Sequence, residues 1–300
     1  MARTVFTHRQ SRNLGDLING KVVRHIERLA GQFNRARQQK MAIFAHDHIG
    51  IHINYFGVYD KPELDLLFRF LAPLADTLRA GLALDVGANI GNHALFFGER
   101  FRAVHAFEPN PTTYHLLAFN AKLAGNVSPH NLGLGSESGV LRLNEDLDNM
   151  GASSIKYAPT GNARSVEIEV RRLDDLDLPL DGLCFMKVDV EGFEPQVLRG
   201  AARTIAAHQP LIVLEQHERE FVDGTTECIA MLREAGYRFC WPRSSHGAKR
   251  GLARQFDSLQ NRLFGRPDLI EMLAADQVPK GQYNMLIAVP PRFQAALGVA

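Results

Sequence analysis

The chain has 300 residues, of which 45% are apolar and 22% are charged, and its formal net charge is +1. This composition is typical of a soluble globular protein and argues against a fibrous, disordered or membrane-embedded class. A chain of this length can bury a core without disulfides or metal ions. It contains no run of about eighteen uncharged apolar residues, and no apolar leader follows Met1. We therefore expect a cytoplasmic protein without a transmembrane segment.

Three cysteines lie far apart among apolar residues: Cys184, Cys228 and Cys240. Their odd number and wide spacing do not fit a disulfide framework or a zinc site. We therefore expect buried free thiols in a reducing compartment.

Basic residues gather in two segments. Residues 1–40 carry nine Lys and Arg against two acidic residues, and residues 242–266 carry six against one, so their net charges are +7 and +5 and the remainder carries −11. Such asymmetry is typical of a surface for an anionic partner. Solvated helix and loop faces explain it as well, so an anionic acceptor, peripheral membrane contact and a homo-oligomer all stay open.

Residues 1–80 are expected to form a basic helical extension. Apolar residues from Leu14 to Phe33 recur three and four positions apart, which predicts an amphipathic helix, and Pro62 suits the first turn of a second one. Between these helices, His46, His48 and His52 alternate with isoleucines. This alternation predicts a strand whose histidines share one face, and ordinary amphipathicity explains it better than a metal site.

From residue 81 onward, short apolar runs alternate with helical stretches. This pattern predicts an α/β fold with a Rossmann-like, mostly parallel sheet whose last strand is antiparallel. We expect one domain over residues 81–300, with a hairpin insertion at about 136–172 and a basic loop at about 242–282. The predicted strands are 82–86, 103–107, 183–188, 211–215, 237–241 and 285–289, and the predicted helices are 92–100, 111–124, 194–207 and 224–236.

The first strand of the domain runs into a glycine-containing loop, DVGANIG, at residues 85–91. Gly87 and Gly91 allow a sharp turn and close approach of a ligand to the backbone before a helix begins. A dinucleotide loop needs a glycine where Asn89 stands, which disfavours an NAD-dependent oxidoreductase. Asp85 would repel a pyrophosphate and attract an ammonium group. The loop therefore suits a nucleoside that carries an amino acid.

Glu108 ends the next strand, 23 residues after Asp85. An acidic residue at this place accepts hydrogen bonds from both hydroxyls of a ribose in the dinucleotide-binding version of the fold. It could also cap the helix that follows Pro109. We favour the ribose interpretation because the two carboxylates would lie at adjacent strand ends.

Six motifs in order and in register resemble the FkbM family of S-adenosylmethionine-dependent methyltransferases, along about residues 80–220. They are DVGANIG, VHAFEPNP, Asn120, MGASSI, MKVDVEGFEPQVLRGA and PLIVLEQHE. The resemblance implies a class I methyltransferase sheet and S-adenosylmethionine as cofactor. It assigns the methionine part of the cofactor to the glycine loop and its ribose to Glu108, so the candidate cofactor residues are Asp85, Gly87, Asn89, Gly91, Asn92, Glu108 and Asn110.

A second polar group follows the central strand and its neighbour: Asp189 and Glu191, then Glu215 and His217. Ligands bind beyond the carboxyl ends of such strands, so these side chains should face the cofactor crevice. Methylation of a hydroxyl needs alignment of the acceptor and removal of its proton. We favour His217 as the base, with Asp189 either aligning the acceptor or contacting the amine of the cofactor. A divalent metal on Asp189, Glu215 and His217 is a weaker alternative that we do not expect.

The acceptor class follows from the resemblance and not from the residues alone. The resemblance implies O-methylation of a sugar, a glycan or a secondary metabolite, with N-methylation as an alternative. Nucleic acid is disfavoured because no aromatic-proline tetrad follows the central strand. The candidate acceptor residues are Tyr59, Ser153, Ser154, Arg250 and Arg254.

Overall fold

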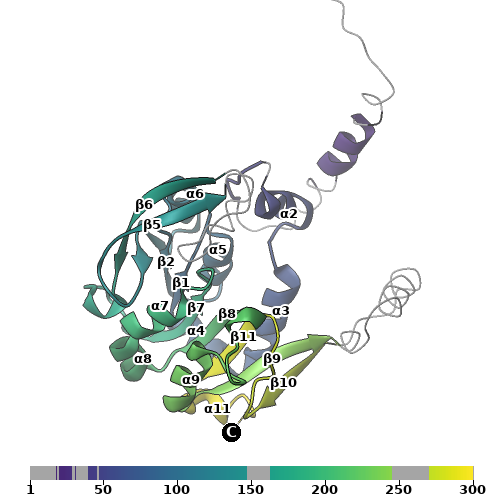
Figure 1. The fold of residues 1–300 in the computed structure, drawn as a ribbon. Helices are drawn as coiled ribbons and strands as arrows, with labels where there is room; N and C mark the ends of the chain where they lie inside the picture. Colours follow the sequence, from purple (N-terminus) through teal and green to yellow (C-terminus); the bar gives the residue numbers. More distant parts are fainter. Residues whose placement is uncertain are drawn as a thin grey trace, which may run out of the picture.

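The protein is described by a computed structural model for residues 18, 20–28, 31, 40–45, 47–146, 163–244 and 270–299. Its centre is an eight-stranded sheet in the order β10-β9-β11-β8-β7-β1-β2-β3 (Figure 1). The strands are β1 (Leu82–Val86), β2 (Ala103–Phe107), β3 (Val127–His130), β7 (Leu183–Val188), β8 (Leu211–Gln216), β9 (Arg238–Ser244), β10 (Ile270–Ala275) and β11 (Tyr283–Val289).

The pairing of these strands confirms the Rossmann-like class. β1 pairs in parallel with β2 and β7, and the parallel ladder continues to β3 on one side and to β8 on the other. β11 is antiparallel to β8, as expected for the last strand. All five residues of β1 and all six of β7 are buried, because helices cover both faces of a parallel sheet.

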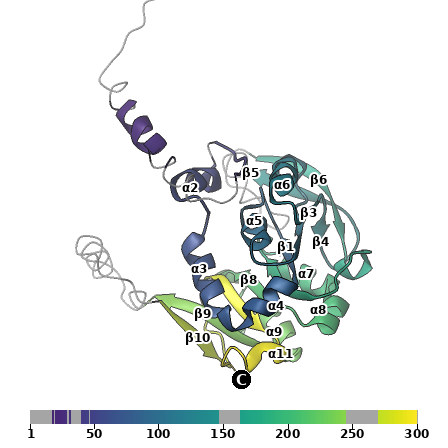
Figure 2. The same ribbon diagram turned by 180° about the vertical axis from the view of Figure 1, so that it is seen from behind.

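Helices form a layer on each face of the sheet (Figures 1 and 2). Alternate strand residues point to opposite faces, so Ala83 joins one core cluster while Leu82 and Leu84 join the other. The first cluster includes side chains of α3 (Lys61–Phe70), α4 (Ala75–Ala80), α5 (Asn92–Gly98), α6 (Pro111–Ala124) and α11 (Pro291–Gln294). The second includes side chains of α7 (Glu194–Gly200), α8 (Ala202–His208) and α9 (Glu227–Glu234).

A second, three-stranded sheet has the order β4-β6-β5. β5 (Gly139–Asp146) and β6 (Ala163–Arg171) pair antiparallel, and β4 (Gly133–Leu134) lies parallel to β6. The predicted hairpin insertion falls on these two long strands. The residues between β5 and β6, which include Ser153 and Ser154, lie outside the described part of the chain.

The expected strand around His48 is wrong, because this segment is the helix α2 (His48–Phe56). The Asp47 side chain accepts a hydrogen bond from the Gly50 N–H and so caps the first turn. Gly57, at φ 82°, ends the helix. Short alternation of apolar residues is ambiguous between strand and helix, and here the cap decides. His48 and His52 lie one turn apart, whereas His46 is outside the described residues.

The expected basic loop is also partly wrong. β9 extends to Ser244, and residues 270–275 form the additional edge strand β10, which pairs antiparallel with β9 over six residue pairs. β10 was missed because the sequence IEMLAA has little alternation and its residues are mostly exposed. The segment with Arg250 and Arg254 is outside the described residues.

The boundary expected at residue 80 falls inside a packed core. Leu64, Leu67 and Leu71 are buried in the same cluster as the strands, and Phe68 contacts Phe185 of β7 with 6.2 Å between ring centroids. Helix α3 therefore belongs to the packing unit of the sheet. Further toward the N-terminus, residues 20–28 are helical, as predicted.

The three cysteines are free and buried, as predicted. Within the described stretches, no helix has the length and apolarity needed to cross a bilayer.

We predict that Leu67→Ala lowers the free energy of unfolding by about 2 to 5 kcal/mol, because it leaves a cavity under the sheet. Arg69→Ala, on the exposed side of the same helix, should change it by less than about 0.5 kcal/mol. Urea unfolding followed by circular dichroism measures both. Equal stability of the two variants would mean that α3 does not fold together with the sheet.

Candidate active site

A cavity of about 290 Å³ opens beyond the carboxyl ends of β1, β2, β7 and β8. Parallel strands end at one edge of a sheet, so residues far apart in sequence meet here. On one side it is lined by the loop after β1 and the end of β2, and on the other by residues that follow β7 and end β8. Among the lining residues are Tyr59, Gly87, Asn89, Glu108, Asn110, Asp189, Glu191 and Glu215.

The loop after β1 lies directly against the end of β7. Gly87 has φ 80°, and a Cβ atom there would lie 1.9 Å from the backbone oxygen of Asp189, so no other residue fits. The backbone of Asn89 is also in the left-handed region, at φ 50°. Gly91 precedes α5, where a Cβ would crowd Leu117 at 2.9 Å. Gly87 thus shapes the cavity wall, whereas Gly91 allows close packing of the loop onto α6.

Glu108 is buried beside this loop and holds it through hydrogen bonds. Its carboxylate accepts one from the Asn89 N–H and one from the Asn110 N–H, each at 2.9 Å. Burial raises the pKa of Glu108 to about 7. Asn110 caps α6 with its side-chain oxygen, 2.9 Å from the Thr112 N–H. The Asn110 Nδ2 is buried and has no hydrogen-bond partner among the described residues.

Two asparagines tie the site to the segments before the sheet. Asn92 accepts a hydrogen bond from the Tyr59 N–H and donates one to the Tyr59 carbonyl, both at 3.0 Å. Asn120 donates to the carbonyls of Ala42 and Ile90 at 2.9 and 2.7 Å. The expected cofactor residue Asn92 thus has a positioning role, since it holds Tyr59 at the edge of the cavity.

The structure places Asp85 away from the cavity wall. Its side chain is fully buried, and its Oδ1 lies 3.6 Å from the Nζ of Lys187. The same ammonium donates to Asp189 at 3.0 Å. Burial alone would lower the pKa of Lys187, but these two carboxylates hold it above its ordinary value. Burial would raise the pKa of Asp189, but Lys187 brings it below the usual range.

The far end of the cavity is acidic. Burial and the neighbouring Asp189 raise the pKa of Glu215 to about 9. Burial also raises the pKa of Glu191, whose backbone is left-handed at φ 53°. Glu215 is therefore protonated near neutral pH, whereas Asp189 is ionised and favours a cationic ligand.

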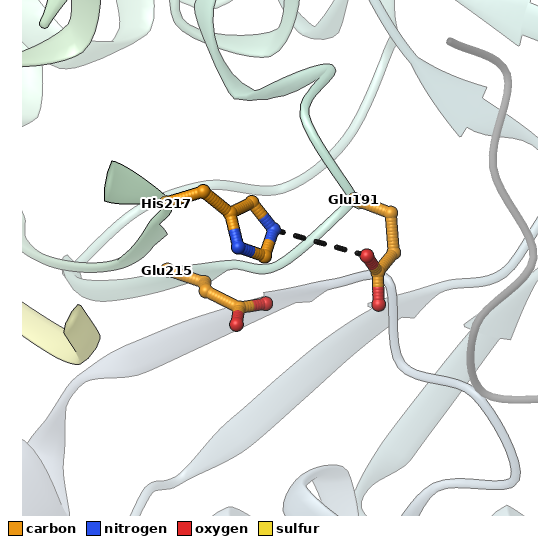
Figure 3. Close-up of side chains that lie close together, drawn as sticks. All are labelled: Glu191, Glu215 and His217. Atoms are coloured by element: carbon orange, nitrogen blue, oxygen red, sulfur yellow. Dashed lines mark ion pairs between the residues drawn. The ribbon is translucent and has the colours of Figure 1, made fainter. Parts of the chain in front are cut away.

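His217 lies next to this acidic end but is not part of the cavity wall. Its Nε2 is 3.9 Å from a carboxylate oxygen of Glu191, and its Nδ1 is 3.2 Å from the Oε1 of Gln282. Figure 3 shows the ring close to the carboxylates of Glu191 and Glu215. Both ring nitrogens therefore face protein groups. The four residues expected to be catalytic lie close together, but only Asp189, Glu191 and Glu215 line the cavity.

Lys187 and His93 are among the cavity-wall residues that sequence reasoning missed, whereas Asp60 was expected next to Tyr59 as a cover of the site. A lysine inside the apolar run LCFMKV was a usable signal, because an unpaired charge is hardly ever buried in a sheet. Burial lowers the pKa of His93 to about 3, so this ring is neutral. Burial and Glu63 raise the pKa of Asp60 to about 6. Only the tertiary structure brings His93 to the site.

A mostly parallel Rossmann-like sheet with a glycine loop, a buried acidic residue after β2 and carboxylates after β7 and β8 defines the protein as a methyltransferase of class I architecture. The chain belongs to the FkbM methyltransferase family, since the model of the FkbM methyltransferase domain matches residues 85–239. This membership confirms that the protein is an enzyme that transfers methyl groups.

Several characterised or solved proteins are similar to the chain. It is 30% identical over 181 residues to Methyltransferase 1 of Beauveria bassiana, covering 48% of this chain and 72% of that one. It is 35% identical over 134 residues to the hexuronic acid methyltransferase AglP of Haloferax volcanii, covering 43% of this chain and 53% of that protein. The crystal structure of methyltransferase FkbM from Methylobacillus flagellatus aligns with a TM-score of 0.33 and 18% identity, over 65% of this chain and 48% of that one.

We predict that Gly87→Ala destabilises the protein more than Gly125→Ala does. Both residues have φ near 80°, but a Cβ at Gly125 meets no atom within 4 Å, whereas at Gly87 it collides with Asp189. The left-handed backbone should cost about 1 to 2 kcal/mol in each variant. The collision should add about 1 to 3 kcal/mol for Gly87→Ala alone. Urea unfolding measures the free energy of unfolding of both variants. Equal free energies would show that the loop moves aside without cost.

Proposed function

We propose that the protein transfers the methyl group of S-adenosylmethionine to a hydroxyl oxygen of a sugar, a glycan or a related secondary metabolite. The observation that carries this proposal is the cavity itself. It joins a glycine loop and a buried Glu108 at one end to the carboxylates of Asp189, Glu191 and Glu215 at the other. One end thus suits a nucleoside and the other a polar acceptor.

The residues at the first end fit the nucleoside part of this cofactor. Each Glu108 oxygen accepts one backbone hydrogen bond and keeps capacity for a ribose hydroxyl. The buried Asn110 Nδ2, which has no partner in the part of the chain that the structure describes, is a donor in the cavity wall that suits a ribose or adenine acceptor. Gly87 has no side chain, and the Asn89 side chain is turned to the following backbone, where its Oδ1 accepts a hydrogen bond from the Ile90 N–H at 2.6 Å. We infer that these four residues would hold the nucleoside.

The acidic character of the cavity fits a cationic ligand. S-adenosylmethionine, when bound, supplies an electrophilic methyl group on a positively charged sulfur. Asp60 and Asp189 line the cavity together with Glu191 and Glu215, and they face one buried ammonium, that of Lys187. The ionised Asp189 would stabilise the positive charge and repel a dinucleotide pyrophosphate, while the protonated Glu215 could donate a hydrogen bond.

For the proton of the acceptor hydroxyl, the geometry favours Asp189 over His217. Asp189 lines the cavity and Lys187 keeps it ionised, so its carboxylate can accept a hydrogen bond and then the proton. His217 is behind the wall and its ring nitrogens face Glu191 and Gln282. We therefore exchange the two roles that the sequence suggested and assign the positioning role to His217.

The similarity to a hexuronic acid methyltransferase supports a sugar as acceptor class. Sugar hydroxyls are polar and form hydrogen bonds with carboxylates, which are the groups that the acceptor end offers. We propose hexuronic acid or hexose hydroxyls as the first acceptors to test.

We predict that Glu108→Gln weakens binding of S-adenosylmethionine by about 1.5 to 3 kcal/mol, or roughly 10- to 150-fold, because a charged acceptor is lost. Titration calorimetry measures this affinity, with NAD as the competing ligand that should not bind. Glu137→Gln, an exposed residue of the same type, is the matched control. Unchanged affinity of a folded Glu108→Gln protein would remove the ribose assignment.

The affinity of the wild-type protein should also depend on pH. The pKa of Glu108 is about 7 without ligand, and ribose hydroxyls donate to its ionised form. Lowering the pH from 8 to 6 protonates most of this carboxyl and should weaken binding about tenfold. Calorimetry at both pH values should show this loss for the wild type and not for Glu108→Gln. Equal pH dependence of the two proteins would contradict the role of Glu108.

We predict that Asp189→Asn lowers kcat by about 10² to 10⁴, the usual contribution of a general base. The assay follows S-adenosylhomocysteine release with oligosaccharides that end in a hexuronic acid or in a neutral hexose. Asp177→Asn, at an exposed position, should keep full activity. Because Asp189 also pairs with Lys187, thermal unfolding must show that the variant is folded. Full activity of the folded variant would exclude Asp189 as the base.

A further inference from the structure

Three potential metal ligands converge at the acceptor end of the cavity. Glu191 follows β7, Glu215 ends β8 and His217 comes just after it. One ligand atom from each of these side chains lies within 4.8 Å of the others. Metal–ligand bonds of about 2.0 to 2.6 Å place opposite ligand atoms about 4 to 5 Å apart, so one ion fits among the three.

The His217 ring is oriented as a metal ligand requires. Its Nε2 is buried without a hydrogen-bond partner among the described residues, and it points toward Glu191. Its Nδ1 lies 3.2 Å from the Gln282 Oε1 and 3.0 Å from the Gln282 Nε2, so it can donate to the amide oxygen or, in the other tautomer, accept from the amide nitrogen. Metal binding through Nε2 selects the first arrangement, in which Nδ1 carries the ring proton. A metal-binding histidine almost always donates its second N–H in this way, which leaves the lone pair of the other nitrogen free for the ion.

Gln282 orients a second member of the cluster as well. Its Nε2 lies 3.4 Å from the Glu215 Oε1 and donates to it. One exposed amide thus contacts two of the three ligand side chains, while Lys187 is engaged with Asp85 and Asp189 at the other side of Glu215. Polar groups that hold ligands in place are a regular part of metal sites.

We propose that Glu191, Glu215 and His217 bind one divalent transition-metal ion of the Mn²⁺ type at the edge of the cavity. Two carboxylates and one imidazole form a mixed oxygen and nitrogen set. Carboxylates suit Mg²⁺, Ca²⁺ and Mn²⁺, while imidazole suits transition metals, so Mn²⁺ satisfies both ligand types. Three protein ligands also leave coordination positions open to the cavity, which Glu191 and Glu215 line.

The role of this ion deepens the proposed function and rests on it. An acceptor oxygen in an open position would be held in place, and the ion would lower the pKa of its hydroxyl. The positive charge would also allow an acceptor with a carboxylate of its own, such as a hexuronic acid, to approach four acidic side chains. The ion would thus make an acidic cavity compatible with an anionic sugar.

Binding of Mn²⁺ to the untagged, full-length chain tests the site directly. After removal of bound metal by a chelator, calorimetry and the paramagnetic resonance of Mn²⁺ should show one ion per chain. Glu191→Gln, Glu215→Gln and His217→Ala should each weaken binding at least about tenfold. Glu218→Gln removes the same charge from an exposed neighbour of His217 and should leave it unchanged.

Gln282→Ala provides a variant whose folding is not in question, because this side chain is exposed. It should weaken Mn²⁺ binding about tenfold, in the range found for groups that orient metal ligands. Absence of Mn²⁺ binding to the wild type, or unchanged binding to a folded His217→Ala protein, would overturn the proposal and leave an ordinary His217–Glu191 ion pair.

Binding of S-adenosylmethionine to the metal-free protein separates this proposal from the proposed function. If S-adenosylmethionine binds but Mn²⁺ does not, the metal site fails and the proposed function stands. If Mn²⁺ binds but S-adenosylmethionine does not with or without the ion, the metal site stands and the proposed function fails.

Discussion

The site depends on one charged group buried inside the sheet, the ammonium of Lys187 between Asp85 and Asp189. Burying an ion costs several kcal/mol after relaxation, and only well-placed opposite charges offset that cost. Asp85 on β1 and Asp189 after β7 lie 3.6 and 3.0 Å from the ammonium, so the two strands are joined by charge as well as by backbone hydrogen bonds. The same interaction keeps Asp189 ionised at the cavity wall.

This charge network lies where the order of strands changes direction. β2 lies on one side of β1 and β7 on the other, so the loops after these strands diverge and leave a crevice between them. The end of the cavity that we propose for the nucleoside derives from β1 and β2, and the proposed acceptor end from β7 and β8. Gly87 bridges the two ends, because its bare backbone allows contact with Asp189. The topology thus places the two proposed ends on neighbouring pairs of strands.

Much of the fold followed from local patterns, because buried parallel strands and amphipathic helices have distinct periods. β1, β2 and β7 were predicted with the bounds that the structure has. Helix α2 and strand β10 were not, since each depends on a partner outside its own sequence. The cap from Asp47 decides the first, and pairing with β9 decides the second.

The sequence by itself determined which chemical groups lie at the strand ends: a glycine loop, an acidic residue after β2 and a cluster of polar groups after β7 and β8. This was possible because the carboxyl ends of parallel strands always share one edge of the sheet. Only the tertiary structure decided which way each side chain faces. It turned Asp85 toward Lys187 and placed His217 behind the cavity wall. It also brought a carboxylate oxygen of Glu191 within 4.8 Å of a carboxylate oxygen of Glu215. These outcomes depend on the order and register of strands about a hundred residues apart and on the left-handed turn at Glu191, which no local pattern encodes.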